Sequence, residues 1–127
     1  MKIFVCEQDP YRAKLIHDIL GVYNYKIVTL DKFGDFFKEA YQQKPAVIVM
    51  NEQFARESGT EVLSKLRTDP VTAHIPVIFI RNDGTLENAI PLNGDTLTEF
   101  VAEPIKIKNL RHYIDRWTIF RSLYIKH

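Results

Sequence analysis

Apolar residues follow two alternating patterns along this chain, short continuous runs and longer stretches with helical spacing. The runs KIFVC (2–6), AVIVM (46–50) and VIFI (77–80) are bounded by polar or turn residues, which is typical of strands buried on both faces of a sheet. YKIVTL (25–30) and the alternating LTEFVA (97–102) also predict strands. We therefore expect five strands, with the three continuous runs at the centre of the sheet.

Four stretches have the spacing of amphipathic helices. The first begins at Asp9 and Pro10, a capping residue followed by a proline suited to the first turn. The second covers 32–43 with Asp31 as the candidate cap, the third ends before Pro70, and the last follows Lys106. The residues expected on their apolar faces are Leu15, Ile16, Ile19 and Leu20; Phe33, Phe36, Phe37, Ala40 and Tyr41; Val62, Leu63 and Leu66; and Ile107, Leu110, Ile114 and Trp117.

The segment between the last two strands is a weak candidate for a further helix. Gly84, Pro91 and Gly94 interrupt it, and a proline in a helix interior costs about 3 kcal/mol. We expect at most a turn or two there. The repeated strand-helix order predicts a single α/β domain with a doubly wound, five-stranded parallel sheet. We expect this domain to cover 1–118, with 119–127 as an extension of the last helix.

Composition limits the function. The 127 residues are 46% hydrophobic and 26% charged, which is ordinary for one globular domain. Cys6 is the sole cysteine, so we expect a buried apolar side chain and neither a disulfide nor a cysteine-based zinc site. No apolar run approaches the ~18 residues of a membrane span, so we expect a cytoplasmic protein without membrane contact. The four histidines lack metal-ligand spacing, and we predict no enzyme, cofactor or small-molecule substrate.

Polar residues follow the predicted strands. Glu7 and Gln8 come after the first strand, Asn51 after the third, Arg81 after the fourth and Glu103 after the fifth. In open parallel sheets, functional groups gather beyond the carboxyl ends of the strands. These five side chains are therefore the candidate site.

The same segments resemble the receiver domain of bacterial response regulators over residues 2–118. KIFVCEQDP (2–10) corresponds to the family's first strand and acidic pair, and Asn51 and Gly59 have the spacing of its phospho-accepting aspartate and a later glycine. LRTDPVTAHIPVIFI (66–80) is similar to the stretch that leads to the family's hydroxyl residue, and FVAEP (100–104) to the segment with its aromatic and lysine. The resemblance implies the strand order 2-1-3-4-5.

The residues at the family's catalytic positions depart from this pattern. The resemblance places Asn51 at the phospho-accepting aspartate, Arg81 at the hydroxyl residue and Glu103 at the lysine. An asparagine amide cannot form the acyl phosphate. Glu7 beside the neutral Gln8 is only a weak candidate for holding Mg²⁺, so we expect no metal. We further predict an ion pair between Arg81 and Glu103, the alternative being that both side chains point into solvent.

The end of the chain is aromatic and basic. The resemblance implies signalling through the family's fourth helix, fifth strand and fifth helix. The candidate interaction residues on this face are Phe100, Tyr113, Trp117, Phe120 and Tyr124. Aromatic residues of this kind dominate interface energetics, so we predict a phosphorylation-independent pseudo-receiver with a protein partner or a second copy as its ligand.

The basic charge near the carboxyl terminus supports one alternative. The basic residues there are Lys106, Lys108, Arg111, Arg116, Arg121 and Lys126, against Asp115 as the single acid. Such a surface can bind nucleic acid non-specifically, although a solvated helix face is the commoner explanation of such a charge cluster. A conventional phospho-accepting regulator ranks below both interpretations.

Overall fold

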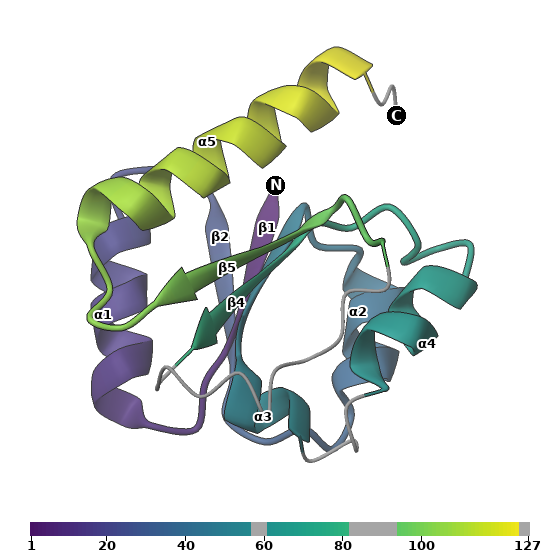
Figure 1. Cartoon of the computed structure of the whole chain (residues 1–127), viewed down its shortest axis with the longest axis horizontal. Helices are drawn as coiled ribbons and strands as arrows, with labels where there is room; N and C mark the ends of the chain where they lie inside the picture. Colours follow the sequence, from purple (N-terminus) through teal and green to yellow (C-terminus); the bar gives the residue numbers. More distant parts are fainter. Residues whose placement is uncertain (57–60, 82–93, 125–127) are drawn as a thin grey trace.

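Five parallel strands form the centre of the fold in the order β2-β1-β3-β4-β5, as the resemblance implied (Figure 1). The computed structural model describes residues 1–56, 61–81 and 94–124, and the side chains as far as Thr118. The strands are β1 (Lys2–Cys6), β2 (Lys26–Leu30), β3 (Val47–Asn51), β4 (Val77–Arg81) and β5 (Thr98–Ala102). The three continuous apolar runs are the three central strands.

Helices cover both faces of the sheet. α1 and α5 lie on one face, and α2, α3 and α4 lie on the other (Figure 1). Their bounds are α1 (Pro10–Leu20), α2 (Phe36–Gln43), α3 (Glu52–Arg56), α4 (Val62–Thr68) and α5 (Ile107–Tyr124). The weak helical segment expected between the last two strands lies mostly on 82–93, outside the described residues. The label α4 therefore belongs to the third helix predicted from the sequence.

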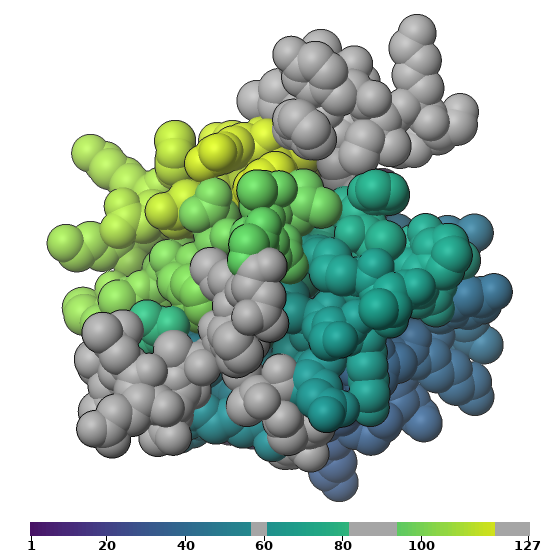
Figure 2. Space-filling view, turned by 45° about the vertical axis from the view of Figure 1, so that its right-hand side comes forward, coloured from purple at the N-terminus to yellow at the C-terminus, as the bar shows by residue number. Residues whose placement is uncertain are grey.

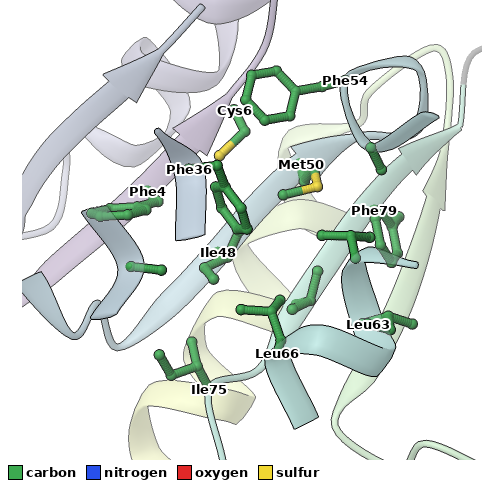
Figure 3. Close-up of a cluster of buried hydrophobic side chains, with 14 residues drawn as sticks. Phe4, Cys6, Phe36, Ile48, Met50, Phe54, Leu63, Leu66, Ile75 and Phe79 are labelled. Atoms are coloured by element: carbon green, nitrogen blue, oxygen red, sulfur yellow. The ribbon is translucent and has the colours of Figure 1, made fainter. Parts of the chain in front are cut away.

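Alternate residues of each central strand contribute to two separate cores, because successive side chains in a strand point to opposite faces. Phe4, Cys6, Ile48, Met50 and Phe79 pack with α2, α3 and α4 (Figure 3). The strand residues between them point to the opposite face and pack with α1 and α5. They are Ile3, Val5, Val47, Val49, Ile78, Ile80 and Val101. The apolar residues of the central strands therefore alternate between two separate cores.

The expected character of Cys6 is confirmed. Its side chain is fully buried in the core shown in Figure 3, and this burial raises the pKa of the thiol well above its ordinary value. A thiol kept protonated in an apolar core is a small hydrophobic side chain and a poor nucleophile.

Three local expectations are corrected. α2 begins after Asp35 rather than Asp31, and the short helix α3, which follows β3 directly, was not predicted. Leu15, Tyr41 and Ile107 were assigned to buried faces but are exposed. Each lies at the edge of the apolar stripe of its helix. Helical spacing alone does not show whether a residue at that edge is buried or exposed.

The first helix begins as predicted and is also tied to the last one. Asp9 caps α1 by accepting a hydrogen bond from the backbone N–H of Tyr11 at 3.0 Å. At the other end of α1, Arg111 of α5 donates from Nε and Nη2 to the carbonyl oxygen of Ile19. This carbonyl belongs to the last turn of α1, where backbone acceptors lack helical partners.

Arg67 connects α4 to the segment before β5. Its Nε forms a 2.8 Å ion pair with Asp95, and its Nη1 donates to the carbonyl oxygen of Ile75 at 2.7 Å. Nη2 donates a longer, 3.4 Å hydrogen bond to Oγ1 of Thr98, the first residue of β5. The planar guanidinium thus joins α4 both to the nearby segment before β4 and to the distant start of β5.

Among the described helices, none combines the length and apolar character needed to cross a membrane.

Candidate functional site

Four strand ends meet at one edge of the sheet. Glu7 follows β1, Asn51 ends β3, Arg81 ends β4 and Glu103 follows β5. The strands are parallel and in adjacent register, with Asn51 opposite Ile80 and Arg81 opposite Ala102. The sequence prediction that these residues share one edge is therefore confirmed.

Glu7 and Asn51 form the buried centre of this edge. Asn51 donates from Nδ2 to Oε1 of Glu7 at 2.8 Å, and each residue is only 1% exposed. The other carboxylate oxygen of Glu7 accepts the backbone N–H of Asp9 at 3.1 Å. The carbonyl oxygen of the Asn51 side chain accepts the backbone N–H of Gln53 at 2.8 Å. The amide of Asn51 thus acts as both donor and acceptor.

Arg12 of α1 also lies at this edge, although the sequence analysis did not identify it. Its Nη1 is 3.7 Å from Glu7 Oε2 and 3.6 Å from Asp9 Oδ2. Its Nε is 2.9 Å from Oε1 of Glu103. The available signal was its place three residues after the cap Asp9, on the first turn of a helix that starts at the site edge.

The predicted ion pair between Arg81 and Glu103 is wrong. Arg81 pairs instead with Glu52 of α3, Nε to Oε1 at 2.7 Å, and Glu103 pairs with Arg12. The backbones are adjacent as expected, because the N–H of Glu103 donates to the carbonyl of Arg81 at 2.9 Å. However, Arg81 is in register with Ala102, so Glu103 has the opposite parity and points to the α1 side.

Phe100 of β5 lies next to Arg81 of β4. The guanidinium carbon of Arg81 is 4.2 Å from the centroid of the Phe100 ring, within the range of a cation–π contact. The same ring stacks on Phe79, its register partner on β4, with centroids 5.5 Å apart. Arg81 therefore bridges a nearly buried carboxylate, Glu52 at 2% exposed, and the aromatic side chain of β5.

Comparison with known proteins assigns this arrangement to a family. The family described as "Response regulator receiver domain" matches residues 3–115, almost the whole sheet and its helices. The chain belongs to the response regulator receiver domain family. Receiver domains are signalling modules of two-component systems, are generally not enzymes, and interact with other proteins such as kinases and effectors.

Relatives of this receiver domain are distant in sequence and close in fold. The chain is 25% identical over 131 residues to the 3',5'-cyclic-nucleotide phosphodiesterase regA of Dictyostelium discoideum, with 98% of the chain and 16% of that protein covered. It is 22% identical to the polar-differentiation response regulator DivK of Brucella anthropi, covering 83% of the chain and 85% of DivK. A receiver domain from Clostridium thermocellum superposes with a TM-score of 0.81 at 20% identity, covering 98% of both chains.

Several relatives are much longer than this receiver domain. The chain spans 16% of regA, 8% of histidine kinase P4 of Formosa agariphila and 18% of protein RcaC of Microchaete diplosiphon. The match to these proteins concerns their receiver portion and not the activities of their other parts.

The donor set does not fit a divalent metal ion. The receiver domain of Pseudomonas aeruginosa PA1611 has a magnesium ion coordinated in its active-site cleft. It is similar in fold, with a TM-score of 0.78 at 17% identity over 91% of this chain and 95% of that one. In this receiver domain, Asn51 directs an N–H donor at Glu7, and the guanidinium of Arg12 approaches the same carboxylate. Mg²⁺ requires oxygen ligands in near-octahedral geometry, and a positive charge beside its main carboxylate opposes its binding.

The predicted interaction residues have different surroundings. Trp117 is 5% exposed and packs in the core with α1, so its proposed place on an interaction surface is corrected. Its position repeats the spacing of Leu110 and Ile114, which explains its burial. Tyr113 and Phe100 are partly buried. The side chains of 119–127, including Phe120 and Tyr124, lie outside the described residues.

Proposed function

We propose that this receiver domain is a phosphorylation-independent protein-interaction module. The observation that carries the proposal is the hydrogen bond from Asn51 to Glu7, because it gives the strand-end residue a structural donor role that an ionised aspartate cannot perform. An amide is also not a nucleophile that can take up a phosphoryl group. The proposal assigns Asn51 to the position where a phospho-accepting receiver carries its aspartate.

The charges around Asn51 support the same proposal. Phosphoryl transfer depends on cations that stabilise the oxygens of the transferring group. Here the nearby cations are already paired, Arg12 with Glu103 and Arg81 with Glu52, and Glu103 adds a negative charge. A phosphoryl group entering this edge would have to displace at least one of these pairs.

The face formed by β5 and α5, which we call the β5–α5 face, is the proposed interaction surface. Figure 2 shows one side of the molecule on which residues 94–102 (green) lie between α4 and its following loop (teal) and α5 (yellow-green). Phe100, held by Arg81, and Tyr113 contribute aromatic surface that remains partly exposed. The proposed occupant is a protein partner or a second copy, and 119–127 would extend the surface beyond the domain.

Contacts within the chain disfavour the nucleic-acid alternative. Arg111 is engaged with the carbonyl of Ile19, Arg116 pairs with Glu99 at 3.1 Å, and Trp117 is buried. A nucleic-acid surface needs basic and aromatic side chains that are available together. We therefore do not adopt this function.

Intact-mass measurement tests the phosphorylation part of the proposal. The protein is incubated with a small phosphodonor and Mg²⁺ and then weighed, with a phospho-accepting receiver as the positive control. We expect no gain of phosphoryl mass, and a stable gain would overturn the proposal.

Light scattering tests the interaction part. We expect a self-association that weakens when residues 119–127 are removed or when Tyr113 is changed to Ala. Tyr11→Ala removes an exposed tyrosine at the opposite end of the chain and is the control. A monomer at every concentration would remove the second copy as occupant, and a pull-down with the intact chain and with Tyr113→Ala would then test a different protein partner.

A further inference from the structure

The guanidinium of Arg12 lies among three carboxylates from different parts of the chain. Glu7 follows β1, Asp9 caps α1, and Glu103 follows β5. The nearest nitrogen–oxygen distances are 3.7 Å to Glu7, 3.6 Å to Asp9 and 2.9 Å to Glu103. One cation is thus shared by three anionic groups.

Burial makes this cation necessary. Glu7 is 1% exposed, and an ionised carboxylate removed from water needs hydrogen bonds and opposite charge. The Asn51 amide and the backbone N–H of Asp9 donate hydrogen bonds to this carboxylate, and both donors are neutral. Arg12 supplies positive charge at the same carboxylate, and its own side chain is 31% exposed, so solvent screens the attraction only in part.

We propose that Arg12 is the resident cation of this site and replaces the divalent ion that a metal-binding receiver holds there. The inference rests on the proposed function, in which the site performs no metal-assisted phosphotransfer. An arginine remains charged at all physiological pH values and cannot dissociate. The positive charge of Arg12 is therefore present at the carboxyl edge of the sheet whatever the concentration of divalent ions.

The same side chain connects α1 to the segment between β5 and α5. Arg12 belongs to the first turn of α1, whereas Glu103 lies between β5 and α5. A bound metal would join the strand ends through exchangeable ligands, but the guanidinium joins them through a covalently attached group. Loss of Arg12 leaves Glu7, Asp9 and Glu103 without their shared cation, and the excess negative charge at this edge would attract added cations.

Thermal unfolding in the presence of a chelator and then of Mg²⁺ or Mn²⁺ tests this inference. We expect the Tm of the wild-type protein to be the same in both conditions. Arg12→Gln removes the charge but keeps a polar side chain, so its Tm should be lower in chelator and should rise saturably with either ion. Arg12→Lys keeps a charge at the end of a long side chain and should show a smaller loss and little response to ions.

Arg116→Gln is the matched control, because it removes an arginine that pairs with Glu99 on the surface. Its Tm should respond to neither ion. A wild-type Tm that rises with Mg²⁺, or an Arg12→Gln variant that is insensitive to both ions, would overturn the inference. If Arg12→Gln does not fold, a folded Arg12→Lys variant that is insensitive to both ions supports the inference, and failure of both variants to fold counts against it.

The outcome is separable from that of the phosphodonor experiment. Metal stabilisation of a wild-type protein that still takes up no phosphoryl group would overturn the role of Arg12 and leave the proposed function intact. Phosphoryl uptake would overturn the proposed function directly.

Discussion

Asn51 Nδ2 lies 2.8 Å from Oε1 of Glu7 and donates a hydrogen bond to it, in surroundings where both residues are 1% exposed. This contact joins the ends of two neighbouring strands, β1 and the central strand β3. It also explains why an amide is present at this strand end, because a carboxylate there would face another carboxylate without a proton between them.

Replacing Asn51 by Asp tests this explanation. The variant loses the donor and places two carboxylates together, so we expect its free energy of unfolding to fall by about 2–3 kcal/mol at neutral pH. Urea denaturation measures the loss, and Asn24→Asp, at an exposed loop position, is the control. We also expect no phosphoryl uptake by intact mass, because Arg81 and Glu103 still occupy the other site positions. Phosphoryl uptake by the variant would show that Asn51 alone blocks the reaction.

A second prediction concerns Arg81 and its two contacts. Arg81→Gln leaves the 2% exposed carboxylate of Glu52 without its guanidinium, so we expect a loss of about 2–3 kcal/mol, reduced from the fully buried case because Arg81 itself is 19% exposed. A double-mutant cycle with Glu52→Gln isolates the pair, and a coupling energy near zero would contradict it. Arg81→Lys keeps the charge but not the planar group above Phe100. In that variant, we expect NMR signals of the Phe100 ring to shift.

Arg67 provides a prediction about the fold alone. A lysine cannot reproduce the combination of the Asp95 ion pair and the bond to the Ile75 carbonyl, so Arg67→Lys should lose about 1–3 kcal/mol of unfolding free energy. The matched control is Arg116→Lys, whose exposed pair with Glu99 should contribute less than about 0.5 kcal/mol. Equal losses in the two variants would show that Arg67 acts only as a charge.

The phenol of Tyr23 makes the stability of the fold depend on pH in the alkaline range. Burial, and after it the hydrogen bond to Asp115, raise the pKa of Tyr23 from 10.0 to about 12. The folded protein therefore keeps this proton to higher pH than the unfolded chain does. The resulting stabilisation is complete below about pH 10 and is lost as the pH rises towards 12.

Ultraviolet titration of the phenol groups, with Tyr23→Phe for assignment, measures this pKa. Asp115→Asn should lower the pKa of Tyr23 towards 10, because it removes the negative charge and weakens the acceptor. Tyr11→Phe, which removes an exposed hydroxyl, should leave the titration of Tyr23 unchanged. An unaltered titration in Asp115→Asn would contradict the role of Asp115.

The strands and the site edge were predictable because they depend on local patterns. Continuous apolar runs identified the central strands, and the end of each run located Glu7, Asn51 and Arg81. The ion-pair partners were not predicted, because two residues at adjacent strand ends can point to opposite faces of the sheet. Arg81 shares the parity of Phe79 and turns to α3, whereas Glu103 shares the parity of Val101 and turns to α1.

Arg12, Arg67 and α3 could not be found from periodicity. Arg12 and Arg67 appear in the sequence as ordinary charged residues of helix surfaces, and only the packing of distant segments supplies their partners. α3 has five residues, too few to show a helical apolar period. Trp117 shows the opposite case, since its spacing correctly indicated burial while its residue type suggested an interface.

The bond between Arg111 and the carbonyl of Ile19 spans 92 positions of sequence, and Arg12 meets Glu103 across a similar stretch. Contacts this distant form late, because most of the chain must be ordered before they close. During synthesis, the apolar face of α1 would emerge from the ribosome long before α5 exists to cover it. The apolar face of α1 is therefore expected to stay exposed on the nascent chain until α5 has been made.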